Sequence, residues 1–324
     1  MSLRARITDS LISAGNLIPK HKRSQSNPFY FNDYRDNLIR PMDPVHEQKY
    51  KEGRGKELEQ TDSSPAKMAS VASSSAMTFN LLGNDLVVFK SNPWFQDGQY
   101  TIEYEKQMFT LNRRSSPANL DAFLANDTAR HGIFCEMKML EWLGAPGTLK
   151  NTYLERDYYI DKAAYPVFRD LAEVLKKTEG VRKDGSHVSI FKRYDAWQMF
   201  KHTLAIYNYT SSTAKEIVDK KTAARSMAEE FEGITLANIV FEMDSDKIKN
   251  ARDRKLYLDA LVCEQTEAHQ FIQIMLDSKY GLLDLFRQNC KVSFDIEYID
   301  VRSFIEHMDK TDAELNLLAK HGYM

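Results

Sequence analysis

The segment IFCEMKML, residues 133–140, decides the fold that we expect for this chain. Six of its eight residues are apolar, and the two exceptions, Glu136 and Lys138, carry opposite charges. In a β-strand, residues two positions apart point to the same face of the sheet. A strand over residues 131–140 therefore places both charges on the face of Phe134, while the three sulfur-containing side chains of the strand point the other way.

The composition is that of an ordinary globular protein. The chain has 324 residues, 43% of them hydrophobic, which suits one large domain or two smaller ones. The formal net charge of −2 argues against electrostatic capture of nucleic acid over the whole surface, although 44 basic residues leave room for a local basic groove. The three cysteines form no CxxC pair, so we expect no zinc ribbon or disulfide framework, and a reducing, cytoplasmic setting fits best.

The N-terminal part of the chain differs in character from the rest. Leu3, Ile7 and Leu11 predict a short amphipathic helix, and residues 20–68 are polar with little periodicity. We interpret residues 1–67 as a polar arm with short helices outside the core, and an organellar targeting peptide is an alternative for its first residues. No apolar run approaches the roughly 18 residues of a membrane span, so no membrane association is expected.

Periodic apolar patterns then predict a single domain over residues 68–324. Helices are predicted at 68–83, 163–180, 193–209, 248–277, 280–289 and 301–308. Strands are predicted at 100–111, 119–127, 131–140, 233–243 and 291–300, with turn residues NDTARHG joining the second and third as a hairpin. The core order of helix, three strands, helix and strand indicates an α/β fold, with an insertion at about 142–192 and a C-terminal helical extension at about 245–324.

The predicted hairpin brings a third charged residue to the pair. Asp121 lies on the strand before Glu136 and Lys138, so pairing of the two strands places the three side chains together. Two neighbouring carboxylates repel each other unless a cation lies between them. Mg²⁺ suits this arrangement, with Mn²⁺ as a substitute, because it is commonly held by one or two carboxylates and a substrate phosphate. A lysine beside the ion can orient a water, so these residues have the parts that phosphodiester hydrolysis needs.

This arrangement resembles the PD-(D/E)XK nuclease superfamily, in which an aspartate on one strand is followed by acid-x-lysine on the next. Asp121 matches the first acid, Glu136 the second and Lys138 the lysine. The superfamily has a restriction-endonuclease-like core, with the order of elements predicted above. More narrowly, the chain is similar to a bacterial restriction-endonuclease-like branch, because it has an SSxA-type segment at Ser73–Asn80 and a further acid, Glu141.

The resemblance implies a Mg²⁺-dependent endodeoxyribonuclease of restriction-enzyme type that acts on DNA, with a homodimer left open. Asp121 and Glu136 would hold the metal with a main-chain carbonyl near Met137, and Lys138 would position the attacking water. The resemblance covers roughly residues 53–245. It further implies supporting roles for Glu141, Gln198, Ser74 and Glu57.

The chain departs from the pattern at two places. Leu120 stands where the pattern has proline before the first acid, although Pro117 lies slightly earlier. The helix that begins at Met68 contains no acid up to Leu82, so Glu57 upstream would have to take the part of the helix acid.

Each candidate residue also has a structural interpretation. Glu136 and Lys138 would form an exposed ion pair worth under about 1 kcal/mol, or would diverge if residues 133–143 were helical. Asp121 would bond a nearby turn and Gln198 would be solvated. Ser74 would permit close packing of a helix on the sheet.

Other polar residues have equally open interpretations. His131 is a turn histidine or a proton carrier. The HKR run at 21–23, with Arg113 and Arg114, would contact DNA backbone or form a solvated face.

Two further functions stay open on the sequence. One is a nuclease-fold module that binds DNA or assembles with other proteins and cleaves weakly or not at all. The other is a nuclease of the same chemistry that acts in phage defence or under RNA direction. Any recognition sequence would be read by the insertion at about 142–192 and by the C-terminal helices.

Overall fold

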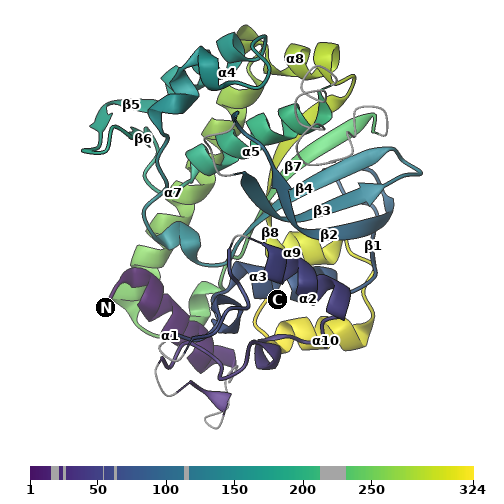
Figure 1. The fold of residues 1–324 in the computed structure, drawn as a ribbon. Helices are drawn as coiled ribbons and strands as arrows, with labels where there is room; N and C mark the ends of the chain where they lie inside the picture. Colours follow the sequence, from purple (N-terminus) through teal and green to yellow (C-terminus); the bar gives the residue numbers. More distant parts are fainter. Residues whose placement is uncertain (16–21, 25–26, 54, 62–63, 113–116, 212–230) are drawn as a thin grey trace.

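The computed structural model describes residues 1–15, 22–24, 27–53, 55–61, 64–112, 117–211 and 231–324. They form an α/β fold in which a mixed, curled sheet of six strands is flanked by helices (Figure 1). The strand order is β1-β2-β3-β4-β7-β8. The strands are β1 (Leu86–Phe89), β2 (Gly98–Met108), β3 (Ala118–Asn126), β4 (His131–Lys138), β7 (Gly233–Val240) and β8 (Ser293–Asp300).

The strand direction changes its pattern at β4. Strands β1 to β4 pair antiparallel, whereas β4, β7 and β8 run parallel, which requires crossover connections. The first crossover contains α4 (Tyr165–Leu175), the hairpin of β5 (Lys176–Val181) and β6 (His187–Ser189), and α5 (Ala196–Thr210). The second contains α7 (Ala251–Leu276) and α8 (Leu282–Asn289).

The remaining helices gather on the other side of the sheet (Figure 1). They are α1 (Leu3–Gly15), α2 (Pro44–Glu52), α3 (Ser74–Leu82), α9 (Val301–Glu306) and α10 (Asp312–Lys320). Short 3₁₀ turns lie at Tyr34–Asn37, Lys67–Ala69, Glu141–Leu143, Asn151–Leu154, Arg156–Tyr158, Ser245–Lys247 and Ser278–Tyr280. Among the helices that the structure describes, none has the length and apolar character that crossing a membrane requires.

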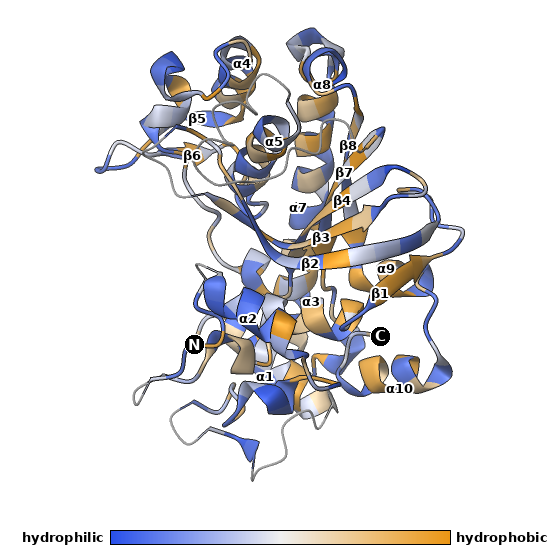
Figure 2. Cartoon of the chain, turned by 45° about the vertical axis from the view of Figure 1, so that its right-hand side comes forward, coloured by the Kyte–Doolittle hydropathy of each residue, from blue (hydrophilic) through white to orange (hydrophobic). Residues whose placement is uncertain are grey.

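The sheet separates two hydrophobic cores, and β4 contributes to both. Phe134 packs with residues of α4, α5, α7 and α8, whereas Cys135 and Met137 pack with residues of α1, α3 and α9. Figure 2 shows hydrophobic residues along the central strands and a hydrophilic tip on the β5–β6 hairpin. The alternation predicted for residues 131–140 is thus confirmed, and the alternative of a helix over 133–143 is wrong.

Several predicted boundaries differ from the structure. Helix α3 begins only at Ser74, because the side chain of Ser73 accepts a hydrogen bond from the amide of Ala76 at 3.2 Å and caps the helix. The helix predicted at 163–180 ends at Leu175, since the next residues pair with β6 despite a helix-compatible composition. Two elements were not predicted from the sequence, the four-residue edge strand β1 and the helix α10.

The N-terminal segment is part of a core, unlike the arm that we expected. Ile7, Phe31 and Tyr50 are buried in the same cluster as α3 and β4. Their spacing follows no single periodicity because they lie in separate short elements, so the sequence pattern did not reveal their burial. Whether residues 1–67 form a unit apart from residues 68–324 stays a prediction.

We expect Tyr50→Ala to destabilise the protein strongly. The Tyr50 ring packs against Tyr104, with ring centroids 5.3 Å apart, and its hydroxyl donates to the carbonyl of Ser75 at 3.3 Å. Loss of a large buried ring should lower the free energy of unfolding by about 3–5 kcal/mol, measured by urea denaturation. In the same helix Val45 is 62% exposed, so Val45→Ala should change the free energy of unfolding by less than about 0.5 kcal/mol. Equal effects of the two variants would contradict burial of this segment.

Candidate functional site

Strands β3 and β4 separate from each other inside the sheet. Their pairing reaches Cys135, although β4 continues to Lys138 with β7 as its partner. Asp121 on β3 and Glu136 on β4 lie one position beyond the last register pair, Ala122–Cys135. There the Asp121 side chain replaces strand pairing, because its Oδ2 accepts a hydrogen bond from the backbone amide of Met137 at 2.7 Å. The two acids therefore lie at the fork between two strands.

The neighbouring strand β2 adds a third acid at this fork. Glu105 lies opposite Asp121, between the register pairs Tyr104–Ala122 and Lys106–Leu120. Its φ of +53° is unusual for a residue other than glycine, and such strain tends to collect at functional sites. The Asn119 side-chain amide donates a hydrogen bond to its carboxylate. Glu105 was not predicted as a site residue, because alternation alone does not single out one acid on a strand with several charges.

Glu136 is enclosed by partners from β4 and α5. Its Oε1 accepts hydrogen bonds from Lys138 Nζ at 2.6 Å and from Gln198 Nε2 at 2.7 Å. Lys138 Nζ also donates to Gln198 Oε1 at 2.7 Å, which closes a three-residue ring. His202 Nε2 lies 3.0 Å from Glu136 Oε2, an ion pair when the imidazole is protonated. The structure thus brings together Asp121, Glu136, Lys138 and Gln198 as predicted.

His202 is a member of this cluster that sequence reasoning missed. It lies one helical turn after Gln198 on α5, and its side chain is only 3% exposed. The sequence signal that could have revealed His202 is its spacing of four residues from Gln198 on a largely apolar helix.

The charges of the cluster shift the protonation of its members. Burial raises the pKa of Glu136, but Lys138 and His202 outweigh it, so this pKa falls to about 2. Burial would lower the pKa of Lys138, yet the Glu136 carboxylate raises it above its ordinary value. Burial and then the charge of Glu136 raise the pKa of Asp121, and burial raises that of Glu105 to about 7. One ion pair therefore lies beside two carboxyl groups whose pKa values are raised.

The predicted supporting residues lie at different distances from this cluster. Glu57 is largely buried, and burial raises its pKa, with Lys67 opposing and the charge of Glu141 adding to the rise. Burial is the main cause that raises the pKa of Glu105, and the charge of Glu57 adds to the rise. Glu57 therefore lies near the fork. Glu141 Oε2 accepts from the Met139 amide at 2.7 Å and its Oε1 lies 3.7 Å from Arg4.

Ser74 has a local role in the structure. It is the first residue of α3, and its carbonyl accepts a hydrogen bond from Thr78 at 2.8 Å. The described contacts of Ser74 do not join it to the acids of the fork, and its supporting role stays a prediction.

The remaining candidates lie away from the fork or outside the described residues. His131 is at the opposite end of β4, with Nε2 3.1 Å from Thr235 Oγ1, and burial lowers its pKa to about 4. This favours the structural interpretation of His131 over a proton carrier. Lys22 pairs with Asp36 at 2.7 Å. The expected DNA contacts of His21, Arg113 and Arg114 fall outside the described residues.

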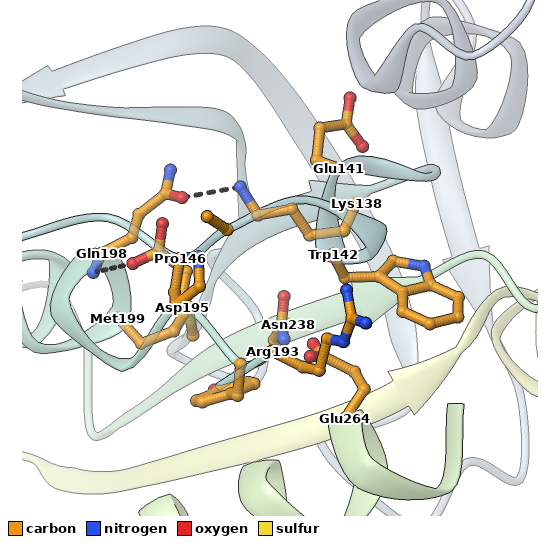
Figure 3. A pocket seen from close by; sticks show the side chains of 12 residues that line it. Lys138, Glu141, Trp142, Pro146, Arg193, Asp195, Gln198, Met199, Asn238 and Glu264 are labelled. Carbon is orange, nitrogen blue, oxygen red and sulfur yellow. Dashed lines mark hydrogen bonds between the residues drawn. The ribbon is translucent and has the colours of Figure 1, made fainter. Parts of the chain in front are cut away.

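A pocket of about 110 Å³ opens next to Lys138 and Gln198. Figure 3 shows these two side chains, joined by their hydrogen bond, on one side of the pocket, with Asn238 and Glu264 further in. The lining comes from the end of β4, the loop after it, the start of α5, β7 and α7: Lys138, Glu141, Trp142, Ala145, Pro146, Arg193, Tyr194, Asp195, Gln198, Met199, Asn238 and Glu264.

Comparisons with family models, with curated proteins and with solved structures find no significant match for this chain. The chemistry of the site therefore rests on its own residues. Within the described residues, no group of three or more His, Cys, Asp or Glu side chains is arranged to hold a metal ion by itself. What stands out is the pair of acids at the fork with the lysine beside them.

We expect Glu105→Gln to stabilise the metal-free protein at pH 8 but not at pH 4. The folded-state pKa of about 7 exceeds the ordinary value of 4.5, so folding favours the protonated carboxyl and stability is lost as the pH rises through 7. The difference at pH 8 should reach at most about 3 kcal/mol by urea denaturation in EDTA. Glu179→Gln, at an exposed position on β5, is the control and should have no such pH dependence. A pH-independent effect of Glu105→Gln would contradict the raised pKa of the Glu105 carboxyl in the folded protein.

Proposed function

We propose that this protein is a Mg²⁺-dependent endodeoxyribonuclease of restriction-enzyme type. Its restriction-endonuclease-like core would be α3, β2, β3, β4, α5 and β7, in the chain order of the PD-(D/E)XK superfamily. The observation that carries the proposal is the fork between β3 and β4, where Asp121 and Glu136 lie side by side with Lys138 next to them.

The donor set at the fork fits Mg²⁺ by its chemistry. Asp121, Glu136 and Glu105 offer hard oxygen ligands, and their mutual repulsion is what a divalent cation relieves. Among the described residues, Asp121 uses only Oδ2 in a hydrogen bond. A group of three protein ligands is not required, because Mg²⁺ usually keeps several waters and takes one or two carboxylates plus substrate phosphates. Bound there, Mg²⁺ would lower the pKa of a water and polarise the phosphodiester.

Lys138 is the residue best placed to act on the substrate. An ammonium group has three donors, and two of those of Lys138 are used by Glu136 and Gln198. The third can hydrogen-bond a water or a phosphate oxygen next to the acids. Gln198 fixes the direction of the Lys138 side chain, and His202 Nε2 lies 3.0 Å from the other oxygen of Glu136, so residues of α5 contact both groups.

One observation favours the second candidate, a DNA-binding or assembly module without cleavage. Both carboxylate oxygens of Glu136 already have partners within the protein, so Glu136 is closed by its own contacts. For Glu136 to bind a metal, at least one of these contacts must be exchanged. A module would keep the closed arrangement, whereas an enzyme would open it when Mg²⁺ binds.

A plasmid assay separates the enzyme from the module. We expect the wild type to nick supercoiled plasmid with Mg²⁺ and not with EDTA, and Lys138→Ala to lose at least about 100-fold in rate, as for other positioned charge donors. Lys255→Ala is the matched control, because Lys255 is an exposed lysine on α7 that pairs with Asp259. Equal rates for wild type and Lys138→Ala would exclude the proposed mechanism, and a parallel RNA substrate decides between DNA and RNA.

Metal binding is tested without any cleavage. Mg²⁺ at 100 times its dissociation constant should stabilise the wild type by about 2.7 kcal/mol, seen as a higher unfolding temperature. Asp121→Asn should remove this effect, while Asp295→Asn, at an exposed position on β8, should keep it. An equal Mg²⁺ effect in wild type and Asp121→Asn would place the ion elsewhere.

A further inference from the structure

The hairpin of β5 and β6 carries a concentration of positive charge on a part of the molecule that protrudes from the body (Figure 1). Residues 176–193 contain six basic and two acidic side chains, whereas the whole chain has 44 basic and 46 acidic residues. Lys177, Arg182 and Lys183 are exposed, and none of the three forms an ion pair with any described residue. Lys176, in contrast, pairs with Glu173 at 2.7 Å. Three cations of the hairpin are therefore available to an anionic partner.

The tip that carries two of these cations is a well-defined turn. Gly185 has a φ of +79°, which is typical of glycine in a hairpin turn, and its amide donates to the carbonyl of Arg182 at 2.9 Å. The amide of Arg182 donates to the carbonyl of Ser186 at 2.7 Å. The Asp184 carboxylate accepts from the amide of Ser186 at 3.0 Å and from its hydroxyl at 2.6 Å. The backbone that presents Arg182 and Lys183 is thus fixed.

The base of the hairpin is anchored to the body of the protein. The backbones of His187 and Leu149 exchange hydrogen bonds at 2.8 and 3.0 Å, and His187 Nε2 lies 2.6 Å from Asn151 Oδ1. The amide of Ile190 donates to the carbonyl of Leu175, the last residue of α4, at 2.9 Å. The hairpin is therefore an arm of defined direction, which reduces the entropic cost of binding through its tip.

The arm extends from the end of the sheet at which the candidate site lies. After β6 the chain passes Arg193, which lines the pocket next to Lys138, and then enters α5, where Gln198 contacts Glu136. The six residues of β5 span about 20 Å when extended. The tip can therefore reach phosphates several base pairs away from a strand that is bound at the fork.

The surroundings of the fork require positive charge from elsewhere. The fork contains Asp121, Glu136 and Glu105, and the ammonium of Lys138 is engaged by Glu136. Three more acids line the neighbouring pocket, namely Glu141, Asp195 and Glu264. These charges repel a polyanion, so the affinity for a phosphate backbone must come from cations outside the fork.

We propose that the β5–β6 hairpin is an arm that binds the backbone of double-stranded DNA beside the fork, through Lys177, Arg182 and Lys183. Contacts of such side chains with phosphates supply affinity that does not depend on the base sequence. The major groove admits a two-stranded ribbon, so the hairpin can lie along the groove with its cations next to the phosphates at the edges. This inference rests on the proposed function and adds the element that holds the DNA, apart from the residues that would cut it.

The salt dependence of DNA binding tests the arm. The affinity of the full chain for a fluorescein-labelled duplex is measured by fluorescence anisotropy in EDTA, which keeps Mg²⁺ from the fork. The hairpin variant combines Lys177→Gln, Arg182→Gln and Lys183→Gln. We expect it to bind at least about tenfold more weakly at low salt, and its plot of log affinity against log salt to be less steep by about 2.7, because three phosphate contacts are lost. Equal affinity and slope of variant and wild type, or no binding by the wild type, overturns the inference.

A matched variant makes the same change of charge outside the hairpin. Lys249→Gln, Arg302→Gln and Lys320→Gln together remove two exposed lysines and one exposed arginine. This variant should keep the affinity and salt slope of the wild type, and both triple variants should keep its unfolding temperature because the replaced side chains are exposed. If the two variants lose affinity equally, binding follows the net charge of the chain and the hairpin is not the arm.

Vesicles that contain phosphatidylserine test the other anionic partner. Val181 and Ile190 are 59% and 43% exposed beside the cations, a combination that also suits an anionic membrane surface. We expect DNA binding and not vesicle binding to depend on the three cations. Vesicle binding that is lost in the hairpin variant while duplex affinity is unchanged overturns the inference.

The binding and plasmid assays can fail separately. Weaker duplex binding by the hairpin variant, without nicking by the wild type, keeps the arm and rejects the nuclease. Nicking by the wild type, with equal duplex affinity of wild type and hairpin variant, keeps the nuclease and rejects the arm.

Discussion

The buried ion pair between Glu136 and Lys138 is the interaction on which the rest of the structure depends. Removing each of these ions from water costs several kcal/mol, and one contact between them rarely compensates for that. The compensation comes from α5, which contributes Gln198 and His202 to the same carboxylate. Because α5 belongs to the crossover between β4 and β7, the parallel half of the sheet and the charge balance of the site form together. A change in the crossover would leave a charge buried without a partner.

The fork between β3 and β4 places two carboxyl groups with raised pKa values beside an ion pair. The Glu136 and Lys138 charges cancel, while burial raises the pKa values of Asp121 and Glu105. If the proposed Mg²⁺ binds here, these carboxyl groups would have to be deprotonated, so metal uptake would be coupled to proton release. The positive φ of Glu105 places backbone strain at the same position, which is consistent with a site shaped for more than stability.

The local sequence pattern was sufficient to predict the central strands β3 and β4 and their acids, Asp121 and Glu136. The period of two in residues 131–140 set both faces of β4, and the hairpin chemistry before it put Asp121 at the correct register. The sequence could not reveal Glu105 or His202, because each gains its meaning only from contacts with elements distant in the chain. For the same reason the burial of Phe31 and Tyr50 was missed, since aromatic residues in short irregular segments have no periodicity to detect.

Helix α7 binds the N-terminal helix α1 across most of the length of the chain. Its 26 residues extend for about 39 Å, and its first turns hold Asp253, which pairs with Arg6 at 2.8 Å across a separation of 247 residues. During synthesis, this contact of α1 can form only after most of the chain has been made, so the final docking of α1 onto α7 belongs to a late stage of folding.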